Sequence, residues 1–144
     1  MKKILRGSLI SMVAMISLTG AGTLQKPDVN VTVSGVEKAD GAIYVSLCRK
    51  NEFLTNRCYR STGKRVDGAA SYDFAFEDVD AGRYAVAAVH DVNGNGQVDR
   101  NSYGAPTEPS GVSGKGLQAG AVPKFEDSAF NVSSKSVRIK VELR

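Results

Sequence analysis

Alternation of hydrophobic and polar residues is the dominant pattern along this chain, and it predicts β-strands. Residues 28–35 carry valine at every second position, and residues 41–48, 71–78 and 136–143 show the same period of two. Such a period places one face of a strand in a core and the other face in water. Residues 83–90, RYAVAAVH, are apolar on both faces, which is typical of a central strand that is covered on both sides.

The segments between these strands are rich in glycine and asparagine, and together the pattern predicts an all-β fold. We expect an antiparallel β-sandwich of about seven strands, with a hairpin turn at residues 80–82 before the central strand. Residues 49–60 are expected to form either one helical turn or an irregular loop. Residues 100–124 show no period and hold three of the four prolines. A structureless loop of that length is uncommon in a compact domain unless it is functional or disordered.

The first 22 residues have the three parts of a secretory signal peptide. Basic residues come first, an apolar run follows at residues 9–18, and small residues close the segment. The apolar run is short and broken by serines, whereas a membrane-spanning helix needs about 20 apolar residues. We therefore expect residues 1–22 to be removed on export. Residues 23–144 are then a single periplasmic or extracellular domain without a stable membrane span.

Removal of that segment changes the charge balance. The whole chain has 19 Lys and Arg against 15 Asp and Glu, a formal charge of +4. Three of the basic residues and none of the acidic ones lie in residues 1–22, which leaves 16 against 15, or +1. No block of like charges remains, so the sequence does not predict binding to nucleic acid.

The chain has two cysteines, Cys48 and Cys58, with nine residues between them. An even number of cysteines in an exported chain predicts a disulfide, and two unpaired thiols are the alternative. A bond closing this short loop stabilises the fold by roughly 2–3 kcal/mol in the chain-entropy model. The spacing is not that of a CxxC redox motif, and two cysteines with one histidine make a poor zinc site.

The most specific local pattern is HDVNGNGQVD, residues 90–99. Side chains that recur at alternate positions of a tightly coiled loop can all face one ion, and a glycine at the sixth position permits the sharp bend. The first, third, fifth, sixth and ninth positions of such a calcium loop are occupied by Asp91, Asn93, Asn95, Gly96 and Asp99. Ser102 stands at the twelfth position, where an EF-hand has glutamate.

This pattern predicts a calcium site with a dissociation constant of about 10⁻⁴–10⁻³ M, since only two local carboxylates contribute. Side-chain oxygens would come from Asp91, Asn93, Asn95 and Asp99, and a backbone carbonyl from Gln97. The missing carboxylate would come from Glu108, with Glu126 and Asp127 as alternatives. Hard oxygen ligands of this kind suit calcium better than zinc or copper. The competing interpretation is an Asx-rich turn without a metal, because Asn and Asp bond their own backbone.

His90 is the only histidine in the chain. We expect its ring to be hydrogen-bonded to the loop backbone, which is a structural role. The alternative is a general base oriented by Asp91 or Glu108, which would make the protein a periplasmic hydrolase. No convincing nucleophile is evident beside the histidine in the sequence, and this favours the structural role.

Taken together, several of these motifs resemble the bacterial family called domain of unknown function 2141 (DUF2141). The shared features are a strand ending in His90-Asp91, the Asn-Gly-Asn-Gly loop at residues 93–96, the Gly-x-Pro-x-Glu segment at residues 104–108, and the Pro-x-Phe-Glu-Asp segment at residues 123–127. The resemblance covers essentially all of residues 23–144. It implies an exported β-sandwich similar to prealbumin-like and immunoglobulin-like domains, and it assigns no activity.

We therefore expect a non-catalytic binding or structural module of the cell envelope. In this interpretation calcium orders the long Gly/Pro segment, which presents a surface to an unknown envelope protein or glycan. A hydrolase using His90 is the first alternative. A carbohydrate-binding module is the second, and it would show a flat exposed tyrosine patch, for which Tyr59, Tyr72 and Tyr103 are the candidates.

Overall fold

The computed structural model describes residues 25–116, 118 and 120–144, so the predicted signal peptide lies outside the described residues. Eight strands and one short helix are found in this part of the chain, which confirms the all-β class. In order they are β1 (Val29–Ser34), β2 (Ala42–Cys48), β3 (Arg60–Arg65), β4 (Ser71–Phe76), β5 (Gly82–Asp91), β6 (Ser110–Val112), α1 (Phe125–Ser128), β7 (Phe130–Val132) and β8 (Val137–Glu142).

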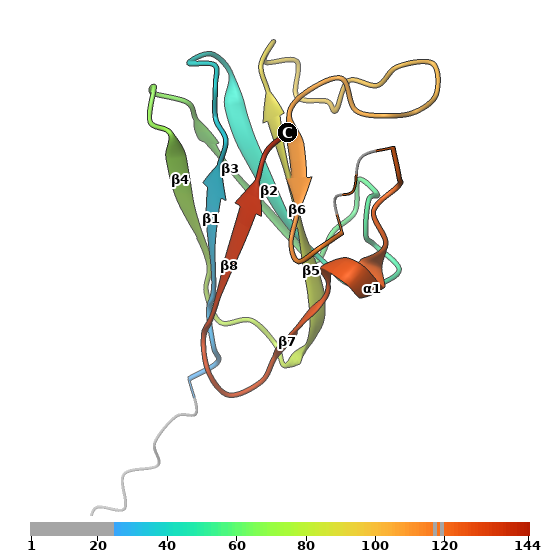
Figure 1. Ribbon diagram of the computed structural model, residues 1–144. Helices are drawn as coiled ribbons and strands as arrows, with labels where there is room; N and C mark the ends of the chain where they lie inside the picture. Colours follow the sequence, from blue (N-terminus) through green and yellow to red (C-terminus); the bar gives the residue numbers. More distant parts are fainter. Residues whose placement is uncertain (1–24, 117, 119) are drawn as a thin grey trace, which may run out of the picture.

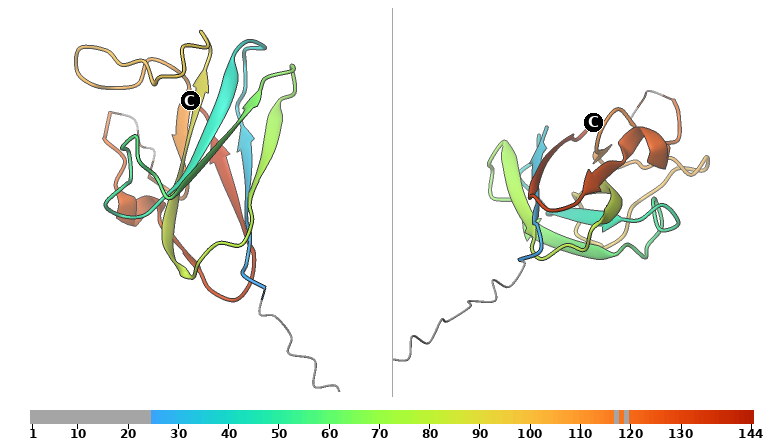
Figure 2. Two further views of the ribbon diagram at one scale, coloured as in Figure 1. Left: turned by 180° about the vertical axis from the view of Figure 1, so that it is seen from behind. Right: turned by 90° about the horizontal axis from the view of Figure 1, so that it is seen from below.

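The strands form two sheets that pack face to face as a sandwich (Figures 1 and 2). One sheet has the order β4-β1-β8, and the other has the order β3-β2-β5-β6 with β7 also paired to β5. The pairings are antiparallel with the exception of β1 and β8, which run parallel. The predicted antiparallel sandwich is therefore confirmed, with one parallel pair that the alternation pattern does not reveal.

The core is built from the hydrophobic positions of the alternating segments. Nearly every second residue of β1, β2 and β4 is buried, whereas the residues between them are wholly or partly exposed. Strand β5 lies between β2 and β6, as predicted from its apolar residues on both faces. The fully buried side chains at the centre include Val29, Val33, Ile43, Val45, Leu47, Val79 and Val86.

Strand β3 was not predicted from the sequence, because its residues, RSTGKR, are polar and show no hydrophobic alternation. Cys48 at the end of β2 forms the predicted disulfide with Cys58, and Arg60 then pairs with Leu47 of β2. Residues 49–57 form the loop closed by this bond, hereafter the disulfide loop. The disulfide thus returns the chain to β2, and charged side chains on the resulting edge strand discourage pairing with another molecule.

The expected hairpin at residues 80–82 is wrong. Strand β4 pairs with β1 and β5 pairs with β2, so the chain crosses here from one sheet to the other. Val79 is completely buried, and its N–H donates to the carbonyl of Pro27 at 2.8 Å. Because Val79 is buried in the core, the turn passes from one sheet to the other. The local sequence resembles a hairpin, but the chain forms a corner of the sandwich here.

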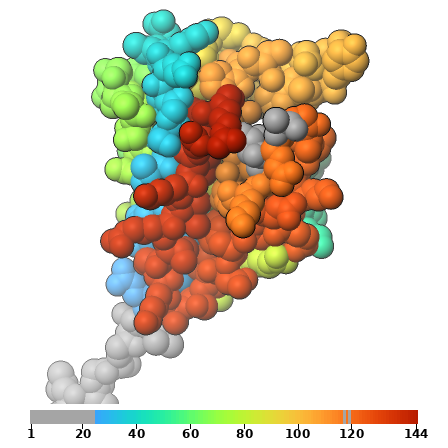
Figure 3. All heavy atoms as spheres, viewed as in Figure 1, coloured from blue at the N-terminus to red at the C-terminus, as the bar shows by residue number. Residues whose placement is uncertain are grey.

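Residues 100–124 are also more regular than their composition predicts. Residues 99–107 form a small hairpin, with the N–H of Thr107 bonded to the carbonyl of Asp99 and a bridge between Arg100 and Pro106. This hairpin projects from one end of the sandwich, in gold to orange (Figures 1 and 3). Strand β6 follows it, and a strand of three residues is too short to show a period.

Candidate functional site

The carboxylate of Asp91, the last residue of β5, is the centre of the loop that follows the strand. The residue is only 1% exposed. Its Oδ1 accepts the backbone N–H groups of Gly94 at 2.7 Å and Asn95 at 3.2 Å, and its Oδ2 accepts that of Gly96 at 2.8 Å. Hydrogen bonds to a charged acceptor are among the strongest in proteins, so one buried side chain fixes three consecutive backbone groups.

The residues of this loop have the conformations that such a tight turn requires. Asn93 Oδ1 accepts the N–H of Asn95 at 3.0 Å, and Asn95 Oδ1 accepts that of Gln97 at 2.8 Å. These are Asx turns. Gly94 and Gly96 have φ angles of +71° and +73°, a region that favours glycine. The spacing that suggested a calcium loop therefore corresponds to a continuous series of Asx turns around Asp91.

Asp99 lies against the same turn. Its Oδ2 accepts the side-chain amide of Asn93 at 2.6 Å, and its Oδ1 accepts that of Asn95 at 3.0 Å. The structure therefore brings together Asp91, Asn93, Asn95 and Asp99, the four predicted side-chain ligands. Gln97, the fifth residue proposed within the loop, is exposed. We call residues 91–99 the Asp/Asn loop.

Glu108 supports the Asp/Asn loop from the other side. It is 9% exposed, and its Oε1 accepts the N–H of Val92 at 3.0 Å while its Oε2 accepts that of Asp99 at 3.3 Å. One carboxylate thus bonds both the beginning and the end of the loop. The predicted proximity of Glu108 to the loop is found, and its partners are backbone N–H groups.

Calcium binds to oxygen atoms, and this cluster offers them from two asparagine amides and from only two charged groups, the carboxylates of Asp91 and Asp99. A carboxylate has about four lone-pair positions, of which Asp91 uses three and Asp99 two in the hydrogen bonds above. No group of three His, Cys, Asp or Glu side chains among the described residues is arranged to hold a metal ion. Two carboxylates are fewer charged ligands than tight calcium sites use.

Glu126 and Asp127 were the alternative sources of the missing carboxylate, and for Glu126 the structure contradicts this. Glu126 forms ion pairs with Lys50 at 2.8 Å and with Arg83, and these two cations hold the pKa of its carboxyl below the ordinary value. Arg83 is near the start of β5, eight residues before Asp91, which is about 26 Å along a strand. Helix α1, which carries both acids, packs beside the disulfide loop through Phe125 and Phe53.

His90 is completely buried, and its Nε2 lies 2.7 Å from the carbonyl oxygen of Asp40, in the turn before β2. The expected bond from the ring to the backbone of the Asp/Asn loop is therefore wrong. Its Nδ1 has no hydrogen-bond partner among the described residues. Neighbouring residues of a strand point to opposite faces, so the structure does not join His90 to Asp91. The ring instead holds the turn before β2 against the end of β5.

Two residues of that turn were missed by sequence reasoning. Asp40 supplies the carbonyl for His90, and Gly41 has a φ angle of +83°. A Cβ atom added to Gly41 would lie 1.9 Å from the carbonyl oxygen of Asp91. The close approach of these two chains therefore requires glycine. Its only sequence signal is an Asp-Gly pair before a strand, which is common in turns.

The three tyrosines considered for a sugar-binding platform do not form one. Tyr59 packs on Tyr84 with 5.4 Å between ring centroids, and Tyr72 is buried with its hydroxyl donating to Asp67. That hydroxyl lowers the pKa of Asp67 below its ordinary value. Tyr103 is 93% exposed on the hairpin at residues 99–107. The flat patch expected from these three residues is therefore absent.

Comparison with known proteins gives one match. The family model described as "Uncharacterized protein conserved in bacteria (DUF2141)" matches residues 31–140. No curated protein and no solved structure matches the chain. Within the described residues, no helix is both long enough and apolar enough to cross a membrane.

The geometry of the Asp/Asn loop predicts a large cost for replacing Asp91 with asparagine. Asp91→Asn retains the size of the side chain but places an NH₂ group against backbone N–H donors, so at least one N–H that was bonded to the buried carboxylate loses its acceptor. We expect a loss of about 2–3 kcal/mol in the free energy of unfolding, measured by urea denaturation. Asp99→Asn is the matched control and should cost less than about 1 kcal/mol, since water can replace its partners. Equal losses in the two variants would contradict the assigned role of Asp91.

Proposed function

This chain belongs to the DUF2141 family, and from that premise we propose that it is an exported, non-catalytic binding module of the bacterial cell envelope. The end of the sandwich that carries the Asp/Asn loop is its binding end. The partner is an envelope protein or glycan. The proposed location is the periplasm or the cell exterior, which the predicted signal peptide and the disulfide both favour.

The observation that carries this proposal is the use of two buried carboxylates to hold one exposed loop. Asp91 and Glu108 together accept five backbone N–H groups from residues 92–99. Surface loops on rigid scaffolds are frequent sites of recognition. A loop that is ordered before binding loses less conformational entropy when a partner docks, which increases affinity.

The surroundings of His90 argue against the hydrolase alternative. A general base must reach the proton that it removes, directly or through one water molecule. The His90 ring is completely buried and bonded through Nε2 to the Asp40 carbonyl. It is therefore placed to connect two segments of the fold, and a role in catalysis would require the core to open.

Calcium binding by the Asp/Asn loop is the second part of the proposal. The oxygen-bearing side chains of Asp91, Asn93, Asn95 and Asp99 surround one turn, and Asp99 contacts both asparagine amides. A bound cation would take the oxygens of Asp99 in place of those amide donors and would add to the order of the loop. The low number of carboxylates limits the dissociation constant to about 10⁻⁴–10⁻³ M.

A thermal and chemical denaturation series tests calcium binding. At 10 mM calcium the oxidised protein should gain about 1.4–2.7 kcal/mol in the free energy of unfolding, as mass action requires for that range of affinity. The gain should disappear with excess chelator and in the Asp99→Asn variant, which retains the Asp91 hydrogen bonds. An equal gain in Asp99→Asn, or none in the parent protein, would refute a calcium site here.

Binding to isolated envelopes tests the module itself. Fluorescently labelled, oxidised protein should sediment with envelopes of the source bacterium in a saturable manner, and unlabelled protein should compete. Asp91→Asn should weaken binding by about tenfold or more, which corresponds to 1.4 kcal/mol, at a temperature where both proteins are folded. Lys140→Ala, on the exposed face of the other sheet, is the matched control and should bind normally. Unsaturable binding, or equal binding by Asp91→Asn, would refute the proposal.

A further inference from the structure

A cleft of about 170 Å³ lies on the outer face of the larger sheet, between the disulfide loop and the Asp/Asn loop. Its floor is formed by residues of β2, β3 and β5. One wall comes from Thr55, Asn56 and Cys58, beside the disulfide, and the other comes from residues 96–98 of the Asp/Asn loop. Pockets for drug-sized ligands are larger, roughly 300–1,000 Å³, so this cleft suits a single small ring or one unit of a polymer.

Tyr44 provides an aromatic surface in the floor of the cleft. It is 42% exposed although it lies in a central part of the sheet. Its cross-strand neighbour on β3 is Gly63, and a Cβ atom at Gly63 would come within 2.7 Å of the tyrosine ring. The ring thus lies over the glycine and is backed by the sheet. A backed aromatic ring with an exposed surface is suited to stacking against the C–H face of a sugar ring, because its apolar area is fixed in place.

The polar groups of the cleft are hydroxyls and amides. Ser46 and Ser61 form a hydroxyl pair at 2.8 Å, and Asn56 and Gln97 approach from the two walls. No charged side chain is among the described residues that line the cleft. A neutral ligand with several hydroxyl groups matches these donors and acceptors, whereas an anion or cation would lose its hydration without gaining an opposite charge.

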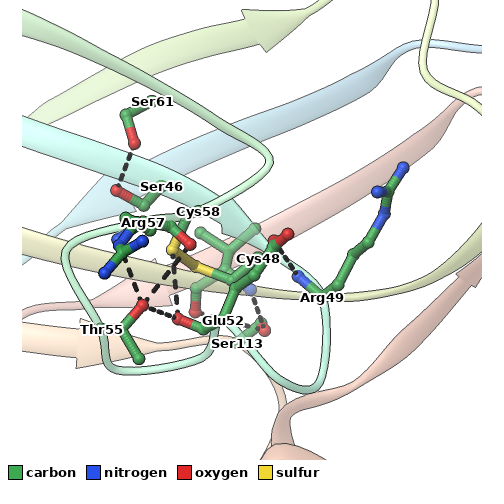
Figure 4. The surroundings of a disulfide bond; sticks show 10 residues. Ser46, Cys48, Arg49, Glu52, Thr55, Arg57, Cys58, Ser61 and Ser113 are labelled. Atoms are coloured by element: carbon green, nitrogen blue, oxygen red, sulfur yellow. Dashed lines mark hydrogen bonds between the residues drawn. A yellow bond between two sulfur atoms is a disulfide. The ribbon is translucent and has the colours of Figure 1, made fainter.

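Both walls of the cleft are held independently of any ligand. Cys58 lines the cleft and is bonded to Cys48, and the hydroxyl of Thr55 donates to the carbonyl of Glu52 at 2.7 Å (Figure 4). On the opposite side, the N–H of Gly96 donates to Asp91. The disulfide and the buried carboxylate are far apart in the sequence, and they fix the two sides of the same cleft.

We propose that this cleft binds one neutral sugar unit of an envelope glycan. Tyr44 stacks on the sugar ring, while Asn56 and Gln97 bond its hydroxyl groups from the two walls. This inference rests on the proposed envelope-binding function and names the chemical class of its ligand. A fixed cleft for a single sugar unit gives weak affinity, with a dissociation constant on the order of 1 mM.

The test is a titration of the oxidised, isotopically labelled protein with neutral hexose and N-acetylhexosamine disaccharides, followed by NMR. A uronic-acid disaccharide and an uncharged tripeptide are the comparison probes. We expect at least one neutral sugar to shift the amide signals of Tyr44, Asn56 and Gln97 in a saturable way. Absence of those shifts with every neutral sugar, or tighter binding of the charged sugar or the peptide, would overturn the proposal.

Variants test whether sugar binding depends on residues of the cleft and not on residues elsewhere in the molecule. Tyr44→Ala and Gln97→Ala should each weaken sugar binding by about tenfold or more, or 1.4 kcal/mol. Tyr44→Phe retains the ring, so it should bind the sugar and show whether loss in Tyr44→Ala comes from stacking. Tyr103→Ala, on the projecting hairpin, should bind like the parent protein, and a loss equal to that of Tyr44→Ala would contradict the assignment.

The same variants distinguish the two proposals. If Tyr44→Ala binds whole envelopes normally and Asp91→Asn does not, the sugar cleft is wrong while the binding module stands. If the parent protein does not bind envelopes saturably, the module itself fails, whatever the sugar titration gives.

Discussion

The buried carboxylate of Asp91, with its hydrogen bonds to the backbone, is the interaction on which the order of the Asp/Asn loop depends. Removing a charged group from water is costly unless hydrogen bonds compensate for it. Three backbone N–H groups of one short turn provide that compensation. Because the carboxylate sits at the end of the central strand β5, the turn is fixed relative to the whole core and not only to its own flanks.

Three further constraints extend this order across the molecule. Glu108 bonds the beginning and the end of the Asp/Asn loop, and the buried His90 ring fastens the turn before β2 to the end of β5. At the far end of β2, the disulfide joins Cys48 to Cys58, two residues before strand β3 begins its pairing with β2. The cleft that results has a floor of sheet residues, one wall joined to β2 by the disulfide and the other bonded to Asp91.

Strands whose buried residues recur at a regular period were predicted from the sequence, and elements without such a period were not. The alternating valines of β1 and the two-sided β5 are unambiguous, whereas β3 is polar, β6 has three residues, and Val79 turns an apparent hairpin into a crossing between sheets. In the site, the spacing of Asp91, Asn93, Asn95 and Asp99 identified the loop because these four residues lie close together in the sequence. Tyr44 and Gly41 were missed because their roles depend on neighbours across strands, which only the pairing register reveals.

Backbone amide hydrogen exchange in the Asp/Asn loop measures most directly whether Asp91 orders this loop, with chelator present so that no cation contributes. The amides of Gly94 and Gly96 belong to exposed residues, yet their N–H groups are bonded to Asp91. Both amides should exchange at least about tenfold more slowly than in an unstructured peptide, and Asp91→Asn should remove this protection. Exchange of both amides in the parent protein at the unstructured rate would contradict this role of Asp91.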